Sequence, residues 1–394
     1  MIQEFEKYKL GNVADFIDYR GKTPPKTISG IPLVTAKIIK DNVIQKPTEF
    51  IEPDFYNQWM RRGIPKKGDV IITTEAPLGE VARIDTSERL AFAQRIIIVH
   101  GHDNALDNDY LFYKLQQSQM KNRLTTRSTG TTVTGIKSAE LKQVMIEVPP
   151  LPVQRAIAAT LSSLDARIAE NRAINHHLEQ MAQAIFKAWF VDFEPWGGVM
   201  PEDWHESILG DICNYNIERT PVAALSCETY ISTENMSSNK AGFVSASSLP
   251  TIAQTTAFKC GDTLISNIRP YFKKIVYCNF EGGCSTDVLC FRPREPKFSV
   301  FIYSLLYSDK FFDYMVAGSK GTKMPRGDKQ QILSYPATIP SNKALEEFVS
   351  LVSPLLEQAD LLKSENIRLA ESRDTLLPRL MSGELSVADL DAVK

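Results

Sequence analysis

The sequence lacks the features that mark membrane, secreted and metal-binding proteins. None of its 394 residues lies in a run that approaches the ~18–20 apolar residues needed to span a membrane. The start, MIQEFEKYKL, has no hydrophobic signal core. All six cysteines lie in the second half, from Cys213 to Cys290, without the paired spacing of a zinc site. We therefore expect a cytoplasmic protein with reduced thiols and no bound metal.

A strong excess of charge is also missing. The formal net charge is −2, so the chain as a whole has no basic signature of nucleic-acid binding. The balance is uneven, since residues 1–150 are net positive and residues 342–394 are net negative. Any contact with DNA must therefore come from local patches.

Catalytic motifs are absent as well. A DNA methyltransferase needs a glycine-rich cofactor loop and an Asn/Asp-Pro-Pro-aromatic tetrapeptide, but Pro149–Pro150 is followed by Leu151. The GKT at 21–23 has Phe16 where a phosphate-binding loop needs glycine. No acidic cluster has the lysine spacing of a nuclease, and no nucleophile is evident. The sequence thus predicts a protein that is not an enzyme.

What the sequence does contain is an internal repeat with a period of about 190 residues. KKGDVIITTEAPLGEVA (66–82) matches KCGDTLISNIRPYFKKI (259–275), with Gly-Asp aligned and a proline nine residues after each glycine. STGTTVTGIKSAELKQVMIEVPP (128–150) matches SKGTKMPRGDKQQILSYPATIPS (319–341). Short β-branched runs between Gly, Pro and Asp predict strands, and 108–124 and 301–316 have helical periodicity. Each repeat is expected to be a sheet-rich α+β domain followed by a long helix.

Each predicted long helix carries apolar residues at spacings of three and four, which is a heptad seam. The first helix would be about 55 Å long at 1.5 Å per residue, longer than one domain needs. We expect the two helices to pair as an antiparallel coiled coil. Pro354 is expected to kink the second helix, which should begin at a Ser341 or Asn342 cap. The predicted seam residues are Leu161, Leu164, Ile168, Asn171, Leu178, Ile185, Val352, Leu355, Leu362, Asn366, Leu369 and Leu376.

The helical signatures are specific to one family. EVPPLPVQRAIAATLSSLDARIAENRAINHHLEQMAQAIFKAWFVDFEP (147–195) resembles the central conserved region of the specificity (S) subunit of Type I restriction-modification systems, and LLPRLMSGEL (376–385) resembles the end of its distal conserved helix. LGNVADFIDYRGKTPP (10–25) is similar to the start of its target recognition domains. The resemblance covers essentially the whole chain. One departure is LPVQ at 151–154, where the family more often has an acidic residue before the glutamine.

The resemblance implies a domain plan and a function. Target recognition domains would occupy 1–150 and 196–341, a central conserved helix 151–195, and a distal conserved helix with a tail 342–394. Each recognition domain would read one half of a bipartite, asymmetric site in double-stranded DNA, with the helices setting the spacing. Two methylation (M) subunits would dock on the chain and restriction (R) subunits could join them. S-adenosylmethionine, ATP and Mg would be bound by these partner subunits and not by this chain.

Residues in loops at strand ends are the candidates for DNA contact. Glycine and hydroxyl residues let backbone amides approach phosphates, basic residues bind phosphates, and Gln and Arg can bond to base edges. In the first domain they are Lys22, Lys26, Lys37, Glu75, Pro77, Leu78, Gln94, Arg95, Arg127, Ser128, Thr129, Gly130, Thr131 and Thr132. In the second they are Glu234, Asn235, Asn267, Arg269, Tyr271, Lys273, Asp287, Lys320, Lys323 and Arg326, with Asp287 aligned to Gln94.

Two alternatives stay open at this point, one for the chain as a whole and one for its aromatic run. A non-catalytic protein–protein adaptor, with two globular domains on a coiled-coil rod, has the same outline. Exposed helix positions such as Arg167, Arg172, Glu179 and Lys187 are expected to receive partner helices. The aromatic run IFKAWFVDF (185–193) either packs under the second domain or anchors a partner.

Overall fold

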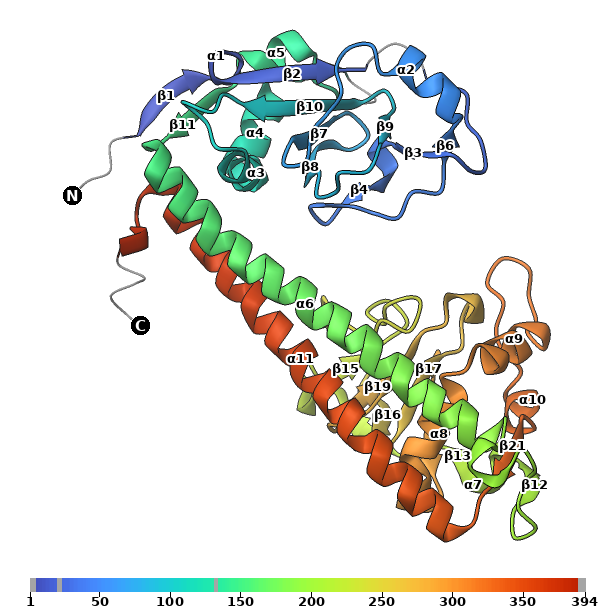
Figure 1. The fold of residues 1–394 in the computed structure, drawn as a ribbon. Coiled ribbons are helices and arrows are strands. Elements are labelled where there is room, and N and C mark those ends of the chain that lie inside the picture. The colour runs from blue at the N-terminus through green and yellow to red at the C-terminus, as the bar shows by residue number, and fades with distance from the viewer. Residues whose placement is uncertain (1–4, 20–22, 131–133, 389–394) are drawn as a thin grey trace. The chain divides into compact units, whose positions relative to one another are not determined.

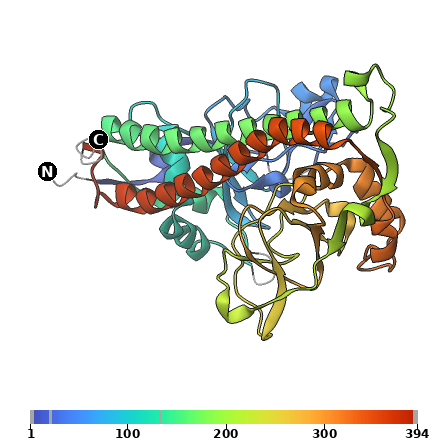
Figure 2. The same cartoon turned by 90° about the horizontal axis from the view of Figure 1, so that it is seen from below.

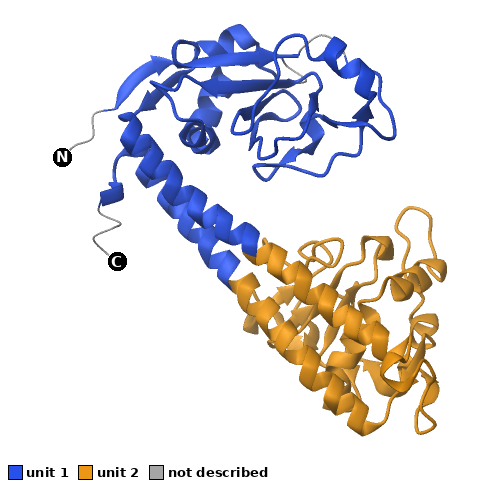
Figure 3. Ribbon diagram, viewed as in Figure 1, with its two compact units in different colours: residues 1–170, 365–394 blue, residues 171–364 orange. Residues whose placement is uncertain are grey.

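The computed structural model describes residues 5–19, 23–130 and 134–388. The chain divides into two compact units, coloured separately in Figure 3. Unit 1 is Met1–Glu170 with Glu365–Lys394, and unit 2 is Asn171–Ser364. Two long helices, α6 (Leu151–Phe190) and α11 (Asn342–Ser382), each contribute to both units, because the division falls inside them.

The body of unit 1 is built on an antiparallel sheet of order β2-β10-β7-β8 (Figure 1). Its strands are β2 (Ala14–Asp18), β7 (Val70–Thr74), β8 (Leu78–Arg83) and β10 (Ile96–Gly101). A second sheet joins β3 (Ile31–Val34), β6 (Phe50–Ile51) and β9 (Ala91–Phe92). Two further pairs are β1 (Glu6–Lys9) with β11 (Met145–Val148), and β4 (Ile39–Lys40) with β5 (Val43–Ile44).

Short helices complete unit 1. They are α1 (Leu10–Val13), α2 (Tyr56–Trp59), α3 (Asn108–Gln116), α4 (Ser118–Thr126) and α5 (Ser138–Lys142), with 3-10 turns at Ala36–Ile38 and Pro53–Phe55. The helical stretch expected over 108–124 is in fact two helices. The chain breaks at Gln117, whose ψ of 140° is extended.

The central strands β7 and β10 are buried on both faces. Ile72 and Ile97 belong to the core shared with α3 and α4, whereas Ile71 and Ile98 belong to the core shared with β3 and β9. Successive side chains of a strand point to opposite faces, so a strand between two cores needs apolar residues at every position. This explains the uninterrupted runs VII and IIIV.

Unit 2 repeats this architecture. Its main sheet has the order β13-β20-β17-β18 and comprises β13 (Cys213–Tyr215), β17 (Thr263–Ser266), β18 (Ile275–Tyr277) and β20 (Val288–Pro293). The second sheet, of order β14-β16-β19-β15, comprises β14 (Arg219–Pro221), β15 (Tyr230–Ile231), β16 (Gln254–Phe258) and β19 (Gly282–Cys284). β12 (His205–Ile208) pairs with β21 (Pro336–Ile339), as β1 pairs with β11.

The helices of unit 2 also follow the order seen in unit 1. They are α7 (Leu209–Ile212), α8 (Ser299–Leu306), α9 (Asp309–Ala317) and α10 (Lys329–Leu333), with 3-10 turns at Glu194–Trp196, Val222–Ala224, Pro270–Phe272 and Pro296–Phe298. The stretch 301–316 is again two helices, and the Ser308 hydroxyl caps the second by accepting from the Phe311 N–H. The α+β class and the internal repeat expected from the sequence are confirmed.

The repeated Gly-Asp marks one tight turn in each unit. Gly68 (φ 93°) and Gly261 (φ 89°) adopt left-handed backbone that favours glycine. The following aspartate accepts the backbone N–H three residues earlier, from Lys66 to Asp69 and from Lys259 to Asp262. Its carboxylate also binds a basic side chain on the neighbouring central strand, His100 at 2.6 Å from Asp69 and Arg292 at 2.8 Å from Asp262.

Within each unit, α6 and α11 pack against each other in opposite directions (Figures 1 and 2). In unit 1 Asp165 bonds Arg373 at 2.8 Å and Arg167 approaches Glu365 at 3.3 Å, while Leu161 and Leu380 share one core. In unit 2 Glu179 pairs with Lys363 at 3.4 Å. Of the predicted seam, Leu161, Ile168, Asn171, Val352 and Leu362 are buried, and Leu164, Leu178, Ile185, Leu355, Asn366, Leu369 and Leu376 are half-buried.

The ends of the long helices are tied to the unit bodies. The Ser341 hydroxyl accepts the Ala344 N–H at 3.4 Å and caps α11, which continues through the exposed Pro354 as one helix. At the end of α6, Phe186 and Phe190 are buried against Phe301 and Phe348 of unit 2. The aromatic run 185–193 is therefore a core element of unit 2.

A buried lysine joins α11 to the body of unit 1. Lys114 of α3 is 2% exposed, and its ammonium donates to the Met381 carbonyl at 3.3 Å. Burial lowers the pKa of this lysine to about 8. Its place between α3 and the end of α11 makes the C-terminal turn of α11 part of unit 1's core.

The Asp262–Arg292 pair predicts a loss of stability on truncation. The side chain of Asp262 is 1% exposed and that of Arg292 15%. Asp262→Ala removes the buried acceptor of the Lys259 N–H and leaves Arg292 with Glu218 as its second partner, so we expect unit 2 to lose about 1–3 kcal/mol of unfolding free energy. The measurement is a urea titration followed by tryptophan fluorescence. Asp309→Ala, at a carboxylate whose side chain is 67% exposed, is the matched control and should cost much less. Equal losses for the two variants would show that the Asp262–Arg292 pair stabilises unit 2 no more than an exposed ion pair does.

Candidate functional site

The loops at one end of unit 1's main sheet lie together. The Thr74 N–H donates to the Arg95 carbonyl at 2.9 Å, and the Ile136 N–H donates to the Thr74 carbonyl at 2.9 Å. Gly135 forms bridges with both Glu75 and Thr129. These bonds gather residues 75–78, 94–95, 127–130 and 134–136, which we call loop cluster 1. It contains the sequence candidates Glu75, Pro77, Leu78, Gln94, Arg95, Arg127, Ser128, Thr129 and Gly130.

Loop cluster 1 contains exposed ion pairs. Arg95 Nε lies 2.6 Å from Glu75 Oε1, and the two side chains are 49% and 36% exposed. Arg127 pairs with Glu140 at 3.0 Å. Arg95 (φ 72°) and Ala76 (φ 46°) adopt left-handed backbone, which is strained for residues other than glycine and is enriched at functional sites. The peptide bond between Ala76 and Pro77 is cis.

The remaining candidates of unit 1 are not part of this cluster. Lys26 pairs with Glu49 at 2.8 Å next to the second sheet. Lys37 is exposed on the 3-10 turn after β3. Lys22, Thr131 and Thr132 lie outside the described residues.

Unit 2 gathers the equivalent loops in the same way. The Asn267 N–H donates to the Asp287 carbonyl at 2.8 Å, and the Gly327 N–H donates to the Asn267 carbonyl at 3.3 Å. Arg326 forms bridges with Ile268 and Lys320. We call residues 267–274, 286–287 and 319–327 loop cluster 2. It holds the candidates Asn267, Arg269, Tyr271, Lys273, Asp287, Lys320, Lys323 and Arg326.

Ion pairs again cross loop cluster 2. Arg326 Nη2 lies 3.0 Å from Asp287 Oδ1, and Lys320 lies 2.6 Å from Asp328. Lys273 and Lys240 both contact Asp309, at 2.8 and 2.9 Å, and hydrogen bonds from these two ammonium groups lower the pKa of Asp309 to about 2. These contacts fasten the β17–β18 loop to α9.

Two candidates of unit 2 lie elsewhere. Glu234 is exposed outside the cluster. Asn235 is 7% exposed, and its amide bonds the Ser232 N–H and the carbonyls of Tyr230 and Val244. All of these bonds hold the 232–244 loop in shape, so the structure gives Asn235 a local structural role.

The strand registers correct the alignment of one pair of candidates. Ile96 lies opposite Thr73, and Val288 lies opposite Ser266, so the residue before each central strand is Arg95 in unit 1 and Asp287 in unit 2. The sequence alignment had placed Asp287 opposite Gln94, one residue too early. Gly135 was not among the residues predicted from the sequence, although it lies at the position of Arg326. The alignment of 128–150 with 319–341 places residue 135 opposite residue 326 and could have identified it.

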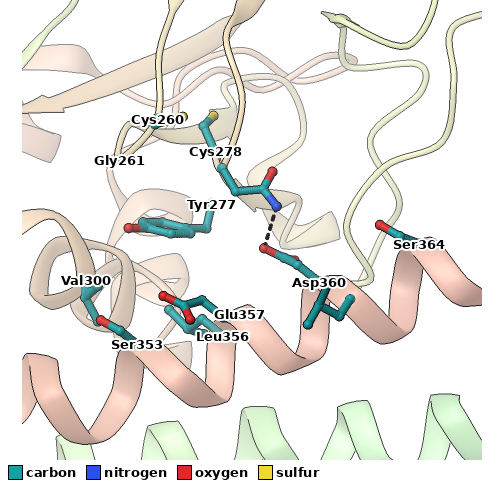
Figure 4. A pocket seen from close by; sticks show the side chains of 12 residues that line it. Cys260, Gly261, Tyr277, Cys278, Val300, Ser353, Leu356, Glu357, Asp360 and Ser364 are labelled. Atoms are coloured by element: carbon teal, nitrogen blue, oxygen red, sulfur yellow. Dashed lines mark hydrogen bonds between the residues drawn. The ribbon is translucent and has the colours of Figure 1, made fainter.

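A pocket of about 520 Å³ in unit 2 lies away from loop cluster 2 (Figure 4). It is lined by Cys260 and Cys278 at the end of the β17–β18 hairpin opposite the loop, and by Glu357 and Asp360 of α11. The Asn279 amide donates to Asp360 at 3.0 Å, and burial raises the pKa of this carboxyl. Among the described residues no group of His, Cys, Asp and Glu has a metal-binding arrangement, and no helix is long and apolar enough to cross a membrane.

A protein that builds such a loop cluster on the equivalent sheet of each of its two units, with different side chains, belongs to the class of two-domain recognition proteins. The chain matches the Type I restriction modification DNA specificity domain family twice, over residues 2–180 and 201–371, and it belongs to this family. The two matches coincide with the internal repeat.

Curated relatives and a solved structure agree with this assignment. The chain is 28% identical over 356 residues to the Type I restriction enzyme MjaIX specificity subunit of Methanocaldococcus jannaschii, covering 82% of this chain and 79% of the relative. It is 22% identical to the EcoDI specificity subunit of Escherichia coli over 71% of each chain. The crystal structure of the Type I S subunit from M. genitalium has the same fold, with a TM-score of 0.60, 18% identity and 96% coverage of both chains.

The bonding of Asn235 predicts a stability effect in place of a recognition effect. Asn235→Ala would leave the buried Ser232 N–H and the Tyr230 carbonyl without partners, so we expect unit 2 to lose about 1–3 kcal/mol of unfolding free energy. Glu234→Ala, at the exposed neighbour, should be nearly neutral. Urea titrations of both variants test this. A stability of Asn235→Ala equal to that of the unmodified chain would be evidence against the structural role.

Proposed function

We propose that the chain is the non-catalytic subunit that selects the DNA target of a Type I restriction-modification complex. In this proposal each loop cluster reads one half of a bipartite, asymmetric site in double-stranded DNA. The observation that carries the proposal is that one loop arrangement is built twice with different side chains. Two units with the same loop arrangement but different contact side chains are suited to a DNA target whose two halves differ in sequence.

Basic side chains at the rims of both clusters supply the general affinity for DNA. Lys320 and Lys323 lie on the 319–327 loop and are exposed, and Arg127 lies at the edge of loop cluster 1. Their ammonium and guanidinium groups would bind phosphates and set the position of each unit on the duplex. Tyr271, 49% exposed, offers a flat apolar surface next to these charges.

The long helices would act as the spacer and as the docking surface for two methylation subunits. Because α6 and α11 run through both units, their length would set the number of unspecified base pairs between the half-sites. Exposed apolar residues on their outer faces, including Ile174, Met181 and Leu361, are suited to partner helices. Arg172 is also exposed, whereas Arg167, Glu179 and Lys187 already form ion pairs within the chain.

The chemistry of the complex is assigned to the partners. The methylation subunits would bind S-adenosylmethionine, and restriction subunits, where present, would use ATP and Mg. This chain would position them in the cytoplasm on the selected DNA.

Salt dependence distinguishes a DNA reader from a protein adaptor. We expect the complex with its methylation subunits to bind duplex DNA with an affinity that falls steeply with salt. If Lys323 contacts a phosphate, Lys323→Ala should reduce the slope of log affinity against log salt by about 0.9. Lys259→Ala removes an exposed lysine at the opposite end of β17 and is the control. Absence of salt-dependent DNA binding would favour the adaptor.

The spacer proposal has its own test. One heptad inserted into each long helix, at 164 and at the paired position 373, keeps the seam in phase and adds about 10 Å at 1.5 Å per residue. We expect the unspecified spacer to lengthen by about three base pairs at 3.4 Å each, with both half-sites unchanged. Long-read methylome sequencing of a host that carries the altered system provides the measurement. An unchanged spacer in an active complex would refute the ruler role of the helices.

A further inference from the structure

Three positions are equivalent in the two loop clusters. The first is the residue beyond strand β7 or β17 that bridges the last loop, Glu75 or Ile268. The second is the residue before the central strand, Arg95 or Asp287, and the third is the bridged residue of the last loop, Gly135 or Arg326. The same backbone hydrogen bonds hold these positions in both units, although at the second position only Arg95 has a positive φ (72°).

Each set of three positions contains one arginine and one carboxylate, in different places. In unit 1 the carboxylate is at the first position and the arginine at the second. In unit 2 the carboxylate is at the second position and the arginine at the third. The second position therefore changes sign between the units, from Arg95 to Asp287. Gly135 leaves room for the Glu75 side chain, because a Cβ there would lie 3.1 Å from Glu75 Cβ and 3.2 Å from Oε2, which is a tight contact.

Stability does not explain these pairs. The side chains of Arg95 and Glu75 are 49% and 36% exposed, and those of Arg326 and Asp287 are 57% and 37% exposed. Ion pairs with this exposure contribute little to folding. Arg95 is moreover held with left-handed backbone at φ 72°, an unfavourable conformation for a residue that serves only as a surface charge.

The polar groups that each pair leaves available match a G·C base pair. The contact in unit 1 uses Arg95 Nε and Glu75 Oε1, which leaves the two terminal nitrogens as donors and Oε2 as an acceptor. The contact in unit 2 uses Arg326 Nη2 and Asp287 Oδ1, which leaves Nη1, Nε and Oδ2. In the major groove guanine presents two acceptors, N7 and O6, and cytosine presents one donor, N4.

We propose that Glu75–Arg95 and Asp287–Arg326 are the base-reading pairs of the two units and that each selects one G·C base pair. The arginine donates to guanine O6 and N7, and the carboxylate accepts from the amino group of cytosine. Because the second position carries arginine in unit 1 and aspartate in unit 2, it faces guanine in one half-site and cytosine in the other. This inference rests on the proposed function and assigns its specificity to four named side chains.

The test uses the complete complex with its methylation subunits. Methylome sequencing of a host with the unmodified system gives the bipartite target. Duplexes with single base-pair substitutions in that target then give the discrimination at each position, from competition binding. A bidentate contact discriminates by about 5- to 150-fold. Arg95→Ala removes the guanidinium donors, so we expect discrimination to vanish at one G·C position of one half-site. Arg326→Ala should do the same in the other half-site.

A change of preference provides a sharper outcome. Asparagine pairs with adenine, so Asp287→Asn is expected to shift the preferred base at its position from cytosine towards adenine. Arg83→Ala is the control, because Arg83 forms an ion pair with Asp109 at 2.5 Å at the other end of β8. It should leave discrimination unchanged at every position. Thermal melting of each variant complex establishes that it is folded.

The outcomes separate this inference from the proposed function. If the unmodified complex gives no bipartite methylation target, the proposed function fails. If it gives one and the Arg95 and Arg326 variants keep full discrimination at every position, the reading pairs are refuted. They are also refuted if the folded variants lose affinity equally for all duplexes, since that result would make the arginines phosphate contacts.

Discussion

The register of the central strand pair in each unit is the constraint on which the loop clusters depend. β7 and β10, and likewise β17 and β20, are buried between two apolar cores, so a shift by one residue would move every side chain into the wrong core. The strand ends are consequently fixed. Arg95 and Asp287 occupy the same place because the strands behind them cannot slide, and the loops can differ in sequence without loss of that placement.

The Gly-Asp turns reinforce this constraint from the other end of the sheet. Asp69 and Asp262 close a turn on a backbone N–H and bind a basic residue of the neighbouring central strand. His100 in one unit and Arg292 in the other show that different nitrogen-bearing side chains can bond the aspartate at this position. A few residues therefore hold the same backbone arrangement in both units, while the side chains of the loop clusters can differ.

Much of this organisation could be predicted from the sequence, because it depends on periodic patterns. The β-branched runs, the heptads and the matched segments predicted the two α+β domains and the pairing of the two long helices. The sequence could not place Lys26, Lys37 and Asn235, since whether a polar residue faces solvent, a neighbour or its own loop depends on tertiary contacts. It also aligned Gln94 with Asp287, because an error of one residue is invisible where identity is low and only strand pairing fixes the register.

The division of the chain has a consequence for biosynthesis. Unit 2 is one uninterrupted segment, whereas unit 1 is completed by residues 365–394. Leu380 and Met381 fill the core of unit 1, and Lys114 donates to the Met381 carbonyl. On the ribosome, unit 2 can thus finish folding first, while the N-terminal lobe waits for the end of α11 to emerge. Apolar surface made early in translation stays uncovered until α11 has been synthesised, which makes the nascent first lobe a natural client for chaperones.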